Sequence, residues 1–168
     1  MQIESVRPTR EVAIRPAAAT DAEPLRRFLT GLSTRSAYSR FFTGLGRVPD
    51  RVLALLLDRG PGQEVLLAVH RGEVVAHGMC SALPGRDGVG ELALVVADAW
   101  QRRGLGQLLA RDLLAAAPEH GFRQIGFTVL AENRPAVRFV TGLWPHARPL
   151  MGHGMYEYLL RVPLRIAA

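Results

Sequence analysis

Residues 101–106, with the sequence QRRGLG, combine two glycines and two arginines with the start of an apolar helical pattern. A glycine-rich turn that leads into a helix lets a ligand approach the backbone, because glycine has no side chain in the way. The unpaired N–H groups and the positive dipole end of the helix favour phosphate there. We expect backbone N–H groups from Arg102 to Gln107 to donate, with the Arg102 and Arg103 side chains adding charge at the rim. The alternative is an ordinary strand-to-helix turn with solvated arginines.

Two other phosphate-binding motifs do not fit this turn. A P-loop requires lysine after its glycines, and the chain contains no lysine, since all 21 of its basic residues are arginine. A dinucleotide fingerprint requires a third glycine where Leu109 stands. A turn of the form Gln/Arg-x-x-Gly-x-Gly/Ala between a buried strand and a helix matches at every position.

Glu91 is the best candidate for proton transfer. It lies at the start of an expected strand and is followed by Leu92 and Leu94. Partial desolvation among such neighbours raises the pKa of a glutamate towards a value useful to a general base. The alternative is a solvent-facing glutamate at a strand end. The histidines, His70 and His77 included, show no tight metal-ligand spacing, so we expect no metal.

Hydrophobic periodicity and turn residues predict the elements that position these groups. Expected strands cover residues 12–15, 64–70, 73–81, 90–96, 122–130 and 155–162, and Arg71-Gly72 forms a hairpin turn. Expected helices run from Thr20 or Asp21 as cap to about Leu29, from Asp50 as cap to Gly60, and over 105–117 and 132–143. Residues 30–42 form a loop or a short helix. This order predicts an α/β protein with a mixed sheet and helices packed on it.

Composition places the chain among ordinary globular proteins. Its 168 residues, 48% apolar and 21% charged, suit one domain spanning 1–168 with a core of about 12–162. The single cysteine, Cys80, suits a reducing cytoplasm. Neither a membrane span nor a signal peptide is apparent, so we expect a cytoplasmic protein with no membrane partner. The net charge of +6 favours anions mildly, but its arginines are scattered, and we expect no nucleic-acid partner.

At the glycine turn the chain resembles the GNAT superfamily of acyl-CoA-dependent N-acetyltransferases. The segment LAENRPAVRFVTGL is similar to the family's second signature, with Asn133, the only asparagine of the chain, at the matching position. Residues 14–42 resemble a subgroup that includes bacterial protein lysine acetyltransferases. The resemblance covers about 12–162 and implies a GNAT-like, mixed, mostly antiparallel central sheet with flanking helices.

The resemblance implies a set of site residues. The strand before the turn should splay from its neighbour, so that backbone groups near Val95 and Val96 bind the pantetheine arm of acetyl-CoA and one N–H polarises the thioester carbonyl. The expected cofactor residues are therefore Val95, Val96, Gln101, Arg102, Arg103, Gly104, Leu105, Gly106, Gln107 and Asn133. Asn133 could equally cap the following helix. Expected acceptor-site residues are Arg35, Tyr38, Arg40 and His77, although a packed helix and a packed histidine explain these positions as well.

The resemblance also implies the reaction, an acetyl transfer from acetyl-CoA to a primary amine by direct attack, with Glu91 as general base. Many relatives place a tyrosine acid where this chain has Val140; water or the departing ammonium could replace it, and Tyr156 and Tyr158 are weak substitutes. The acceptor is a protein lysine or a small amine, and the protein a monomer or homodimer. The alternative function is non-catalytic acyl-CoA binding.

Overall fold

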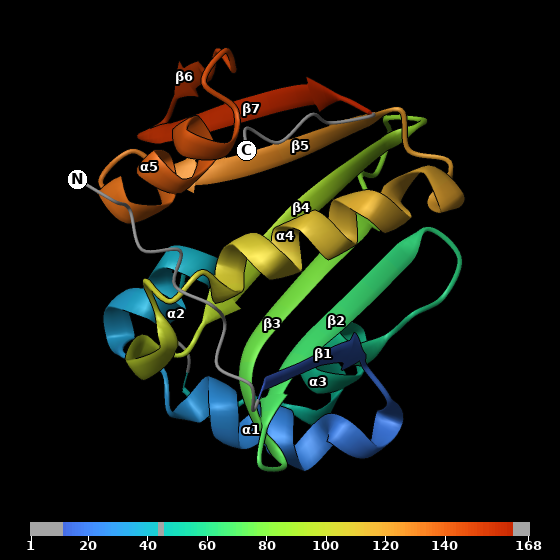
Figure 1. Ribbon diagram of the computed structural model, residues 1–168, viewed down its shortest axis with the longest axis vertical. Helices are drawn as coiled ribbons and strands as arrows, with labels where there is room; N and C mark the ends of the chain where they lie inside the picture. The colour runs from blue at the N-terminus through green and yellow to red at the C-terminus, as the bar shows by residue number, and fades with distance from the viewer. Residues whose placement is uncertain (1–11, 44–45, 163–168) are drawn as a thin grey trace, which may run out of the picture.

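The computed structural model describes residues 12–43 and 46–162 of the chain. A single seven-stranded sheet in the order β1-β2-β3-β4-β5-β7-β6 runs through this part (Figure 1). Its strands are β1 (Val12–Pro16), β2 (Gln63–His70), β3 (Glu73–Ala82), β4 (Val89–Val96), β5 (Gln124–Leu130), β6 (Leu150–Gly152) and β7 (Met155–Arg161). Each neighbouring pair is antiparallel except β4 and β5, which are parallel. The described residues thus confirm a mixed, mostly antiparallel sheet.

Five α-helices of the described residues cover the two faces of this sheet: α1 (Ala22–Thr30), α2 (Thr34–Phe41), α3 (Asp50–Leu57), α4 (Leu105–Ala116) and α5 (Arg134–Leu143). One apolar cluster packs α4 and α5 against one face, with Leu109, Leu113 and Val140 among its buried residues. A second cluster packs α1 and α3 against the other face through residues such as Leu25 and Leu53. Side chains of β2 and β3 on one face of the sheet pack in the first cluster and those on the other face pack in the second, because successive side chains of a strand point to opposite faces.

The parallel pair β4–β5 is where the sheet opens. The two strands pair only over Val89↔Gln124, Gly90↔Ile125 and Glu91↔Gly126, although each continues for several residues beyond. In Figure 1 they meet at the upper right and diverge to the left, where α2 and the first turn of α4 lie. Residues after Glu91 therefore have no strand partner on this side among the described residues.

Several expectations about the elements are confirmed within one or two residues, including the hairpin turn, where Arg71 and Gly72 both have positive φ. The undecided segment 30–42 contains helix α2, which begins after Ser33, whose side chain accepts a hydrogen bond from the Ser36 N–H. Helix α3 ends at Leu57, three residues before the expected stop at Gly60, and its N-cap is Pro49, not Asp50. The terminal segments, on which the expectation of no signal peptide depends, lie outside the described residues.

Two details of the elements differ from the expectation for identifiable reasons. Asp21 is the N-cap residue of α1, as expected, but its side chain makes no capping hydrogen bond, because its carboxylate instead binds the Arg15 guanidinium at 2.7 and 2.8 Å and accepts from the Ala18 N–H. Strand β6 was missed because it is only three residues long and fully exposed, so it carries no hydrophobic alternation. Its two-residue turn to β7, His153-Gly154 with positive φ at both residues, was the signal available.

Candidate active site

A cavity of about 680 Å³ occupies the gap between β4 and β5. Its walls come from β4, β5, α2, α5 and the turn that begins α4, so segments far apart in sequence meet in it. The splay explains the cavity, because two paired strands would leave no room between them. Nine of the predicted cofactor residues line it: Val95, Val96, Gln101, Arg102, Gly104, Leu105, Gly106, Gln107 and Asn133.

The glycine turn opens helix α4 towards this cavity. Gly104, its N-cap, has a φ of 78°, a left-handed conformation that favours glycine. Leu108 donates to the Gly104 carbonyl at 3.1 Å, so the N–H groups of Leu105, Gly106 and Gln107 precede the hydrogen-bond ladder of the helix. These three residues line the cavity, and such a helix start is suited to a pyrophosphate.

Gly106 has a different reason to be glycine. A Cβ atom there would lie 3.6 to 3.7 Å from side chains of Leu94, Phe139 and Val96, which is ordinary contact distance. The fold therefore tolerates a methyl group at this position. Because these three residues line the cavity, any larger side chain would occupy its space.

The open edge of β4 offers backbone groups from alternate residues. Ala97 donates to the Val75 carbonyl of β3 at 2.9 Å, and Val95 faces His77 across the same pair of strands. Antiparallel alternation then directs the groups of Val95 towards β3 and those of Leu94 and Val96 towards the open edge. Leu94 and Val96, rather than Val95, are the backbone candidates for the pantetheine arm.

The three residues before Gly104 make different contacts. The Gln101 amide donates to the Val96 carbonyl at 3.0 Å and to the Ser36 hydroxyl at 3.1 Å, which ties β4 to α2. Arg102 lines the cavity. Arg103 does not; its guanidinium lies over the Trp100 ring, 5.2 Å from the centroid.

Helix α2 is fixed to the glycine turn through Asp98. The Asp98 carboxylate accepts from the Ser33 N–H at 3.0 Å and from the Ser33 and Ser36 hydroxyls at 2.7 and 2.8 Å. Burial raises the pKa of Asp98, but these hydrogen bonds outweigh it and hold the pKa below its ordinary value. This contact could not be predicted from sequence patterns, because Asp98 lies 65 residues from Ser33 and 62 residues from Ser36.

Glu91 lies at the vertex of the splay, at the last paired position of β4 and β5. Its half-buried carboxylate lines the cavity and accepts a hydrogen bond from the Thr128 hydroxyl of β5 at 3.4 Å. This geometry leaves the carboxylate accessible from the gap, as a general base requires. Thr128 is a site residue that sequence reasoning missed.

Arg40 and His77 lie behind Glu91 on the α2 side of the sheet, and only Arg40 reaches the cavity. His77 is fully buried, its Nε2 bonds the Leu56 carbonyl at 2.8 Å, and it does not line the cavity, so it is a packed histidine here. Burial, and then the charge of Arg40, lower the pKa of His77 to about 4, so its ring is neutral at pH 7. Within the described part of the chain, the buried Nε of Arg40 and the buried Nδ1 of His77 both lack a hydrogen-bond partner.

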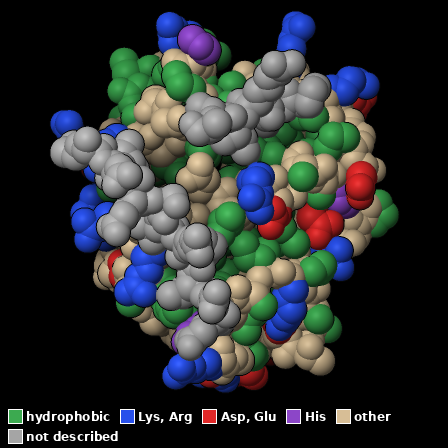
Figure 2. Space-filling view, viewed as in Figure 1, with side chains coloured by type: hydrophobic (Ala, Val, Ile, Leu, Met, Phe, Trp, Pro, Cys, Tyr) green, Lys and Arg blue, Asp and Glu red, His purple; other side chains and the backbone are tan. Residues whose placement is uncertain are grey.

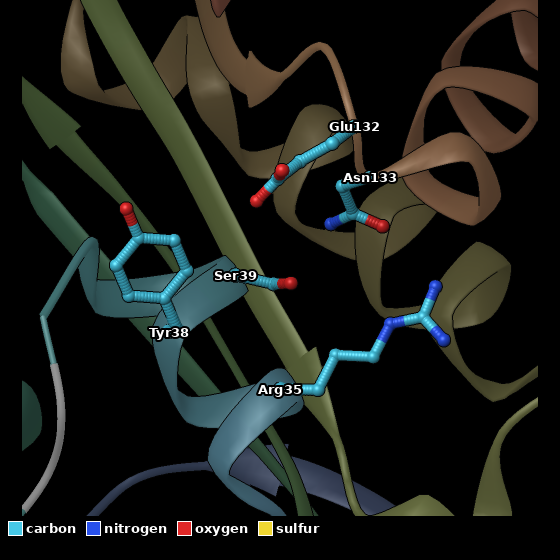
Figure 3. Close-up of a pocket in the computed structure, with 5 residues that line it drawn as sticks. All are labelled: Arg35, Tyr38, Ser39, Glu132 and Asn133. Carbon is cyan, nitrogen blue, oxygen red and sulfur yellow. The ribbon is translucent and has the colours of Figure 1, made fainter.

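A smaller pocket of about 260 Å³ adjoins the main cavity between α2 and the start of α5 (Figure 3). Arg35, Tyr38 and Ser39 line it from α2, and Glu132 and Asn133 face them from the turn after β5. Asn133 accepts from the Ala136 N–H at 3.3 Å, so it caps α5 while lining both pockets. Two predicted acceptor residues, Arg35 and Tyr38, thus lie together in this smaller pocket.

The position expected to carry an acid holds the buried side chain of Val140, which lines the main cavity. Tyr156 and Tyr158 of β7 do not line either pocket, and Tyr38 lines only the smaller one. Among residues 12–43 and 46–162 no group of three or more metal-ligating side chains comes together. Within the same part of the chain no helix is long and apolar enough to cross a membrane. Basic side chains on the face shown in Figure 2 are dispersed among other types.

Comparison with known proteins identifies the family of the chain. The sequence profile of the acetyltransferase (GNAT) family matches residues 32–142, which includes α2, the glycine turn and nearly all of α5. The acetyltransferase PA5475 of Pseudomonas aeruginosa is 33% identical over 139 residues, which are 79% of this chain and 73% of that protein. The family profile and this relative define an acetyltransferase. The chain belongs to the GNAT acetyltransferase family.

Solved structures carry the same fold. The GNAT domain of S. lividans PAT superposes with a TM-score of 0.80 at 24% identity and 90% coverage of each chain. The PaiA N-acetyltransferase of Thermoplasma acidophilum, solved in complex with coenzyme A, has a TM-score of 0.71 at 11% identity, covering 89% of this chain and 98% of its own. These likenesses confirm the expected α/β GNAT fold.

Proposed function

We propose that this acetyltransferase moves the acetyl group of acetyl-CoA to a primary amine by direct attack, with Glu91 as general base. One observation carries the proposal: the Glu91 carboxylate lies at the vertex of the same cavity that the α4 glycine turn enters from its other end. A base and a phosphate-binding turn at opposite ends of one gap suit an extended acyl-CoA with its thioester near the base.

Each part of the cavity has a role in this proposal. The N–H groups that begin α4 bind the pyrophosphate. The open-edge groups of Leu94 and Val96 hold the pantetheine arm, and one N–H stabilises the negative charge that develops on the thioester oxygen. Apolar walls such as Phe127 and Phe139 exclude water from the reacting carbonyl.

The reaction balances as follows. A free primary amine is mostly protonated at pH 7, since its pKa is about 10.4, so Glu91 accepts a proton directly or through water. The amine nitrogen bonds to the carbonyl carbon and the carbon–sulfur bond breaks. Because no tyrosine lines the main cavity, the proton that the thiolate takes comes from water or from the substrate ammonium.

A protein lysine is our first choice of acceptor. The choice depends on the resemblance of residues 14–42 to a lysine acetyltransferase subgroup. The smaller pocket, which Arg35, Tyr38 and Glu132 line, supports this choice. A pocket with polar side chains beside the main cavity gives the polypeptide around a lysine room to bind. A small-molecule amine is the second choice.

Label transfer from radiolabelled acetyl-CoA into a lysate of the source organism tests both the acetyl transfer and the class of its acceptor. Label in the protein fraction above an enzyme-free control supports a lysine acceptor, and label only in small molecules supports a metabolite amine. No transfer to either fraction, with coenzyme A bound normally, would leave a non-catalytic acyl-CoA-binding module. The Glu91→Gln variant, run in parallel, should transfer almost none.

A further inference from the structure

Arg40 is a cation of the candidate active site that has no ion-pair partner among the described residues. It is the seventh residue of α2 and lines the main cavity. Its Nε is buried without a hydrogen-bond partner, and no ion pair involves its guanidinium in the described part of the chain. The group stacks only on the ring of its neighbour Phe41, 4.8 Å from the centroid. Other arginines of the same helical layer, such as Arg26 and Arg27, have carboxylate partners.

The surroundings of Arg40 do not neutralise it fully. His77 is neutral, so it neither repels nor pairs with the Arg40 charge. Glu91, which lines the same cavity, attracts Arg40 but forms no ion pair with it. Burial lowers the pKa of Arg40 to about 10, which still leaves it charged at pH 7. A buried charge that lacks hydrogen bonds is unfavourable, and a ligand that pairs with it recovers that free energy.

The phosphates of the cofactor are poorly placed to be this ligand. Ser33 and Ser36, in the first turn of α2, contact Asp98 and Gln101 beside the glycine turn. Arg40 lies seven residues after Ser33, a rise of about 10 Å along the helix axis. Arg40 therefore faces the Glu91 end of the cavity, where the acceptor enters.

We propose that Arg40 binds a carboxylate of the acceptor, so that the enzyme selects amines that carry an anionic group close to the reacting nitrogen. This inference rests on the proposed function, because it names the acceptor of that same site. A guanidinium binds a carboxylate through two parallel hydrogen bonds, which fixes orientation as well as position.

Charge complementarity supports the same class of acceptor. Glu91 and Arg40 present a negative and a positive group at one end of the cavity. A simple ammonium that approaches Glu91 is repelled by Arg40. An acceptor with both an ammonium and a carboxylate matches the two groups at once. Such a carboxylate comes either from a free amino acid or from an acidic residue beside a lysine in a protein.

The test compares acceptors that differ only in the carboxylate. One arm uses ω-amino acids of increasing chain length, each against its neutral amide. The other uses short peptides with Glu or Gln beside a single lysine. For the wild type we expect kcat/KM to be about 10- to 100-fold higher for the carboxylate member, as a charge-assisted hydrogen bond permits. Preference in the first arm identifies a free amino acid, and in the second an acidic protein segment.

Variants locate the preference. Arg40→Gln should bring the ratio to about one, and Arg40→Lys should keep part of it, since lysine retains the charge without the planar fork. Arg51→Gln, which removes an exposed arginine from α3, should keep the wild-type ratio. An unchanged dissociation constant for coenzyme A shows that a variant is folded.

Three results would overturn the proposal. A wild-type ratio near one in both arms needs no variant and would exclude a carboxylate subsite while leaving the acetyltransferase proposal intact. A full ratio retained in folded Arg40→Gln would assign the preference to another residue. Failure to acetylate any amine, with coenzyme A bound, would remove the proposed function and this inference together.

Discussion

The two ends of the main cavity are built from different materials. The end at α4 is mostly backbone: a left-handed glycine, a second glycine and the first N–H groups of a helix. The end at Glu91 is made of side chains from three separate elements, with Glu91 on β4, Thr128 on β5 and Arg40 on α2. A backbone site needs only a short run of sequence, whereas a side-chain site exists only after the elements have packed.

This difference predicts which functions the two ends can lose separately. Changes at the α4 end should alter affinity for the cofactor, because we propose that this end binds its pyrophosphate, which does not react. Changes at the Glu91 end should alter turnover and acceptor choice, because we propose that the reacting amine binds there. Gln101 bonds Val96 of β4 and Ser36 of α2, and α2 carries Arg40 at the Glu91 end, so a change at Gln101 should affect both.

The largest effect should follow from Glu91→Gln. This change removes the proton acceptor but keeps the size of the side chain, so we expect kcat to fall by about 100- to 10,000-fold. The dissociation constant for coenzyme A, measured by calorimetry, should not change. Glu119→Gln, at an exposed position in the short helix after α4, is the matched control. A Glu91→Gln enzyme with normal turnover would exclude Glu91 as the base.

The next effect should come from the opposite end, in Gly106→Val. Space exists for a Cβ but not for ligand and valine together, so we expect the dissociation constant for coenzyme A to rise by at least about tenfold, a cost of roughly 1.4 kcal/mol. Gly142→Val, at an exposed glycine of α5 with open space around it, controls for the helix propensity of valine. Equal cofactor affinity in both variants would show that the ligand does not pass Gly106.

Local patterns in the sequence were sufficient to predict the structure of the α4 end of the cavity. The glycine turn, the strand before it and the helix after it are contiguous, and the structure has all three at the expected residues. The hairpin before them was equally clear, since Arg71-Gly72 separates two alternating strands. The splay, however, came only from family resemblance, because no composition or period distinguishes a strand that loses its partner after three residues.

The Glu91 end could be predicted only in part. Glu91 was named because it starts an apolar strand and because the family resemblance implies a glutamate base there, but its contact with Thr128 joins residues 37 apart. Arg40 and His77 were both named, yet nothing in the sequence said which would face the cavity. Strand pairing decides it: His77 lies opposite Val95 and points into the layer under α3, where the Leu56 carbonyl accepts its Nε2–H.

His77 allows a test of whether the layer behind Glu91 is purely structural. Its pKa is about 4 in the folded protein and about 6.5 in the unfolded chain, so the unfolded chain binds the proton more readily. The stability that the neutral ring contributes is complete above about pH 6.5 and is lost as the pH falls towards 4, at roughly 1.4 kcal/mol per pH unit. His77→Gln should remove this part of the slope in denaturant titrations.

Two comparisons make the His77 result specific. His146→Gln, which removes an exposed histidine, should retain the wild-type dependence of unfolding free energy on pH. All other titrating groups, including His77, are unchanged in this variant. The pH dependence of kcat/KM in His77→Gln should match that of the wild type. If the unfolding free energies of the wild type and His77→Gln depend on pH in the same way, the buried neutral ring is contradicted. A shift in the pH profile of kcat/KM would indicate that His77 acts in the acceptor site.

The smallest effect should be that of Gln101→Ala, which tests the link between the two ends. The change removes two neutral hydrogen bonds, to the Val96 carbonyl and the Ser36 hydroxyl, each worth about 1 kcal/mol. Because Ser36 remains bonded to Asp98, helix α2 should loosen rather than detach. We expect increases of about fivefold in both the dissociation constant for coenzyme A and the KM for the acceptor. Gln124→Ala on β5, outside the cavity lining, should change neither. An increase in only one constant would mean that the ends act independently, and that Asp98 alone holds α2 against the turn.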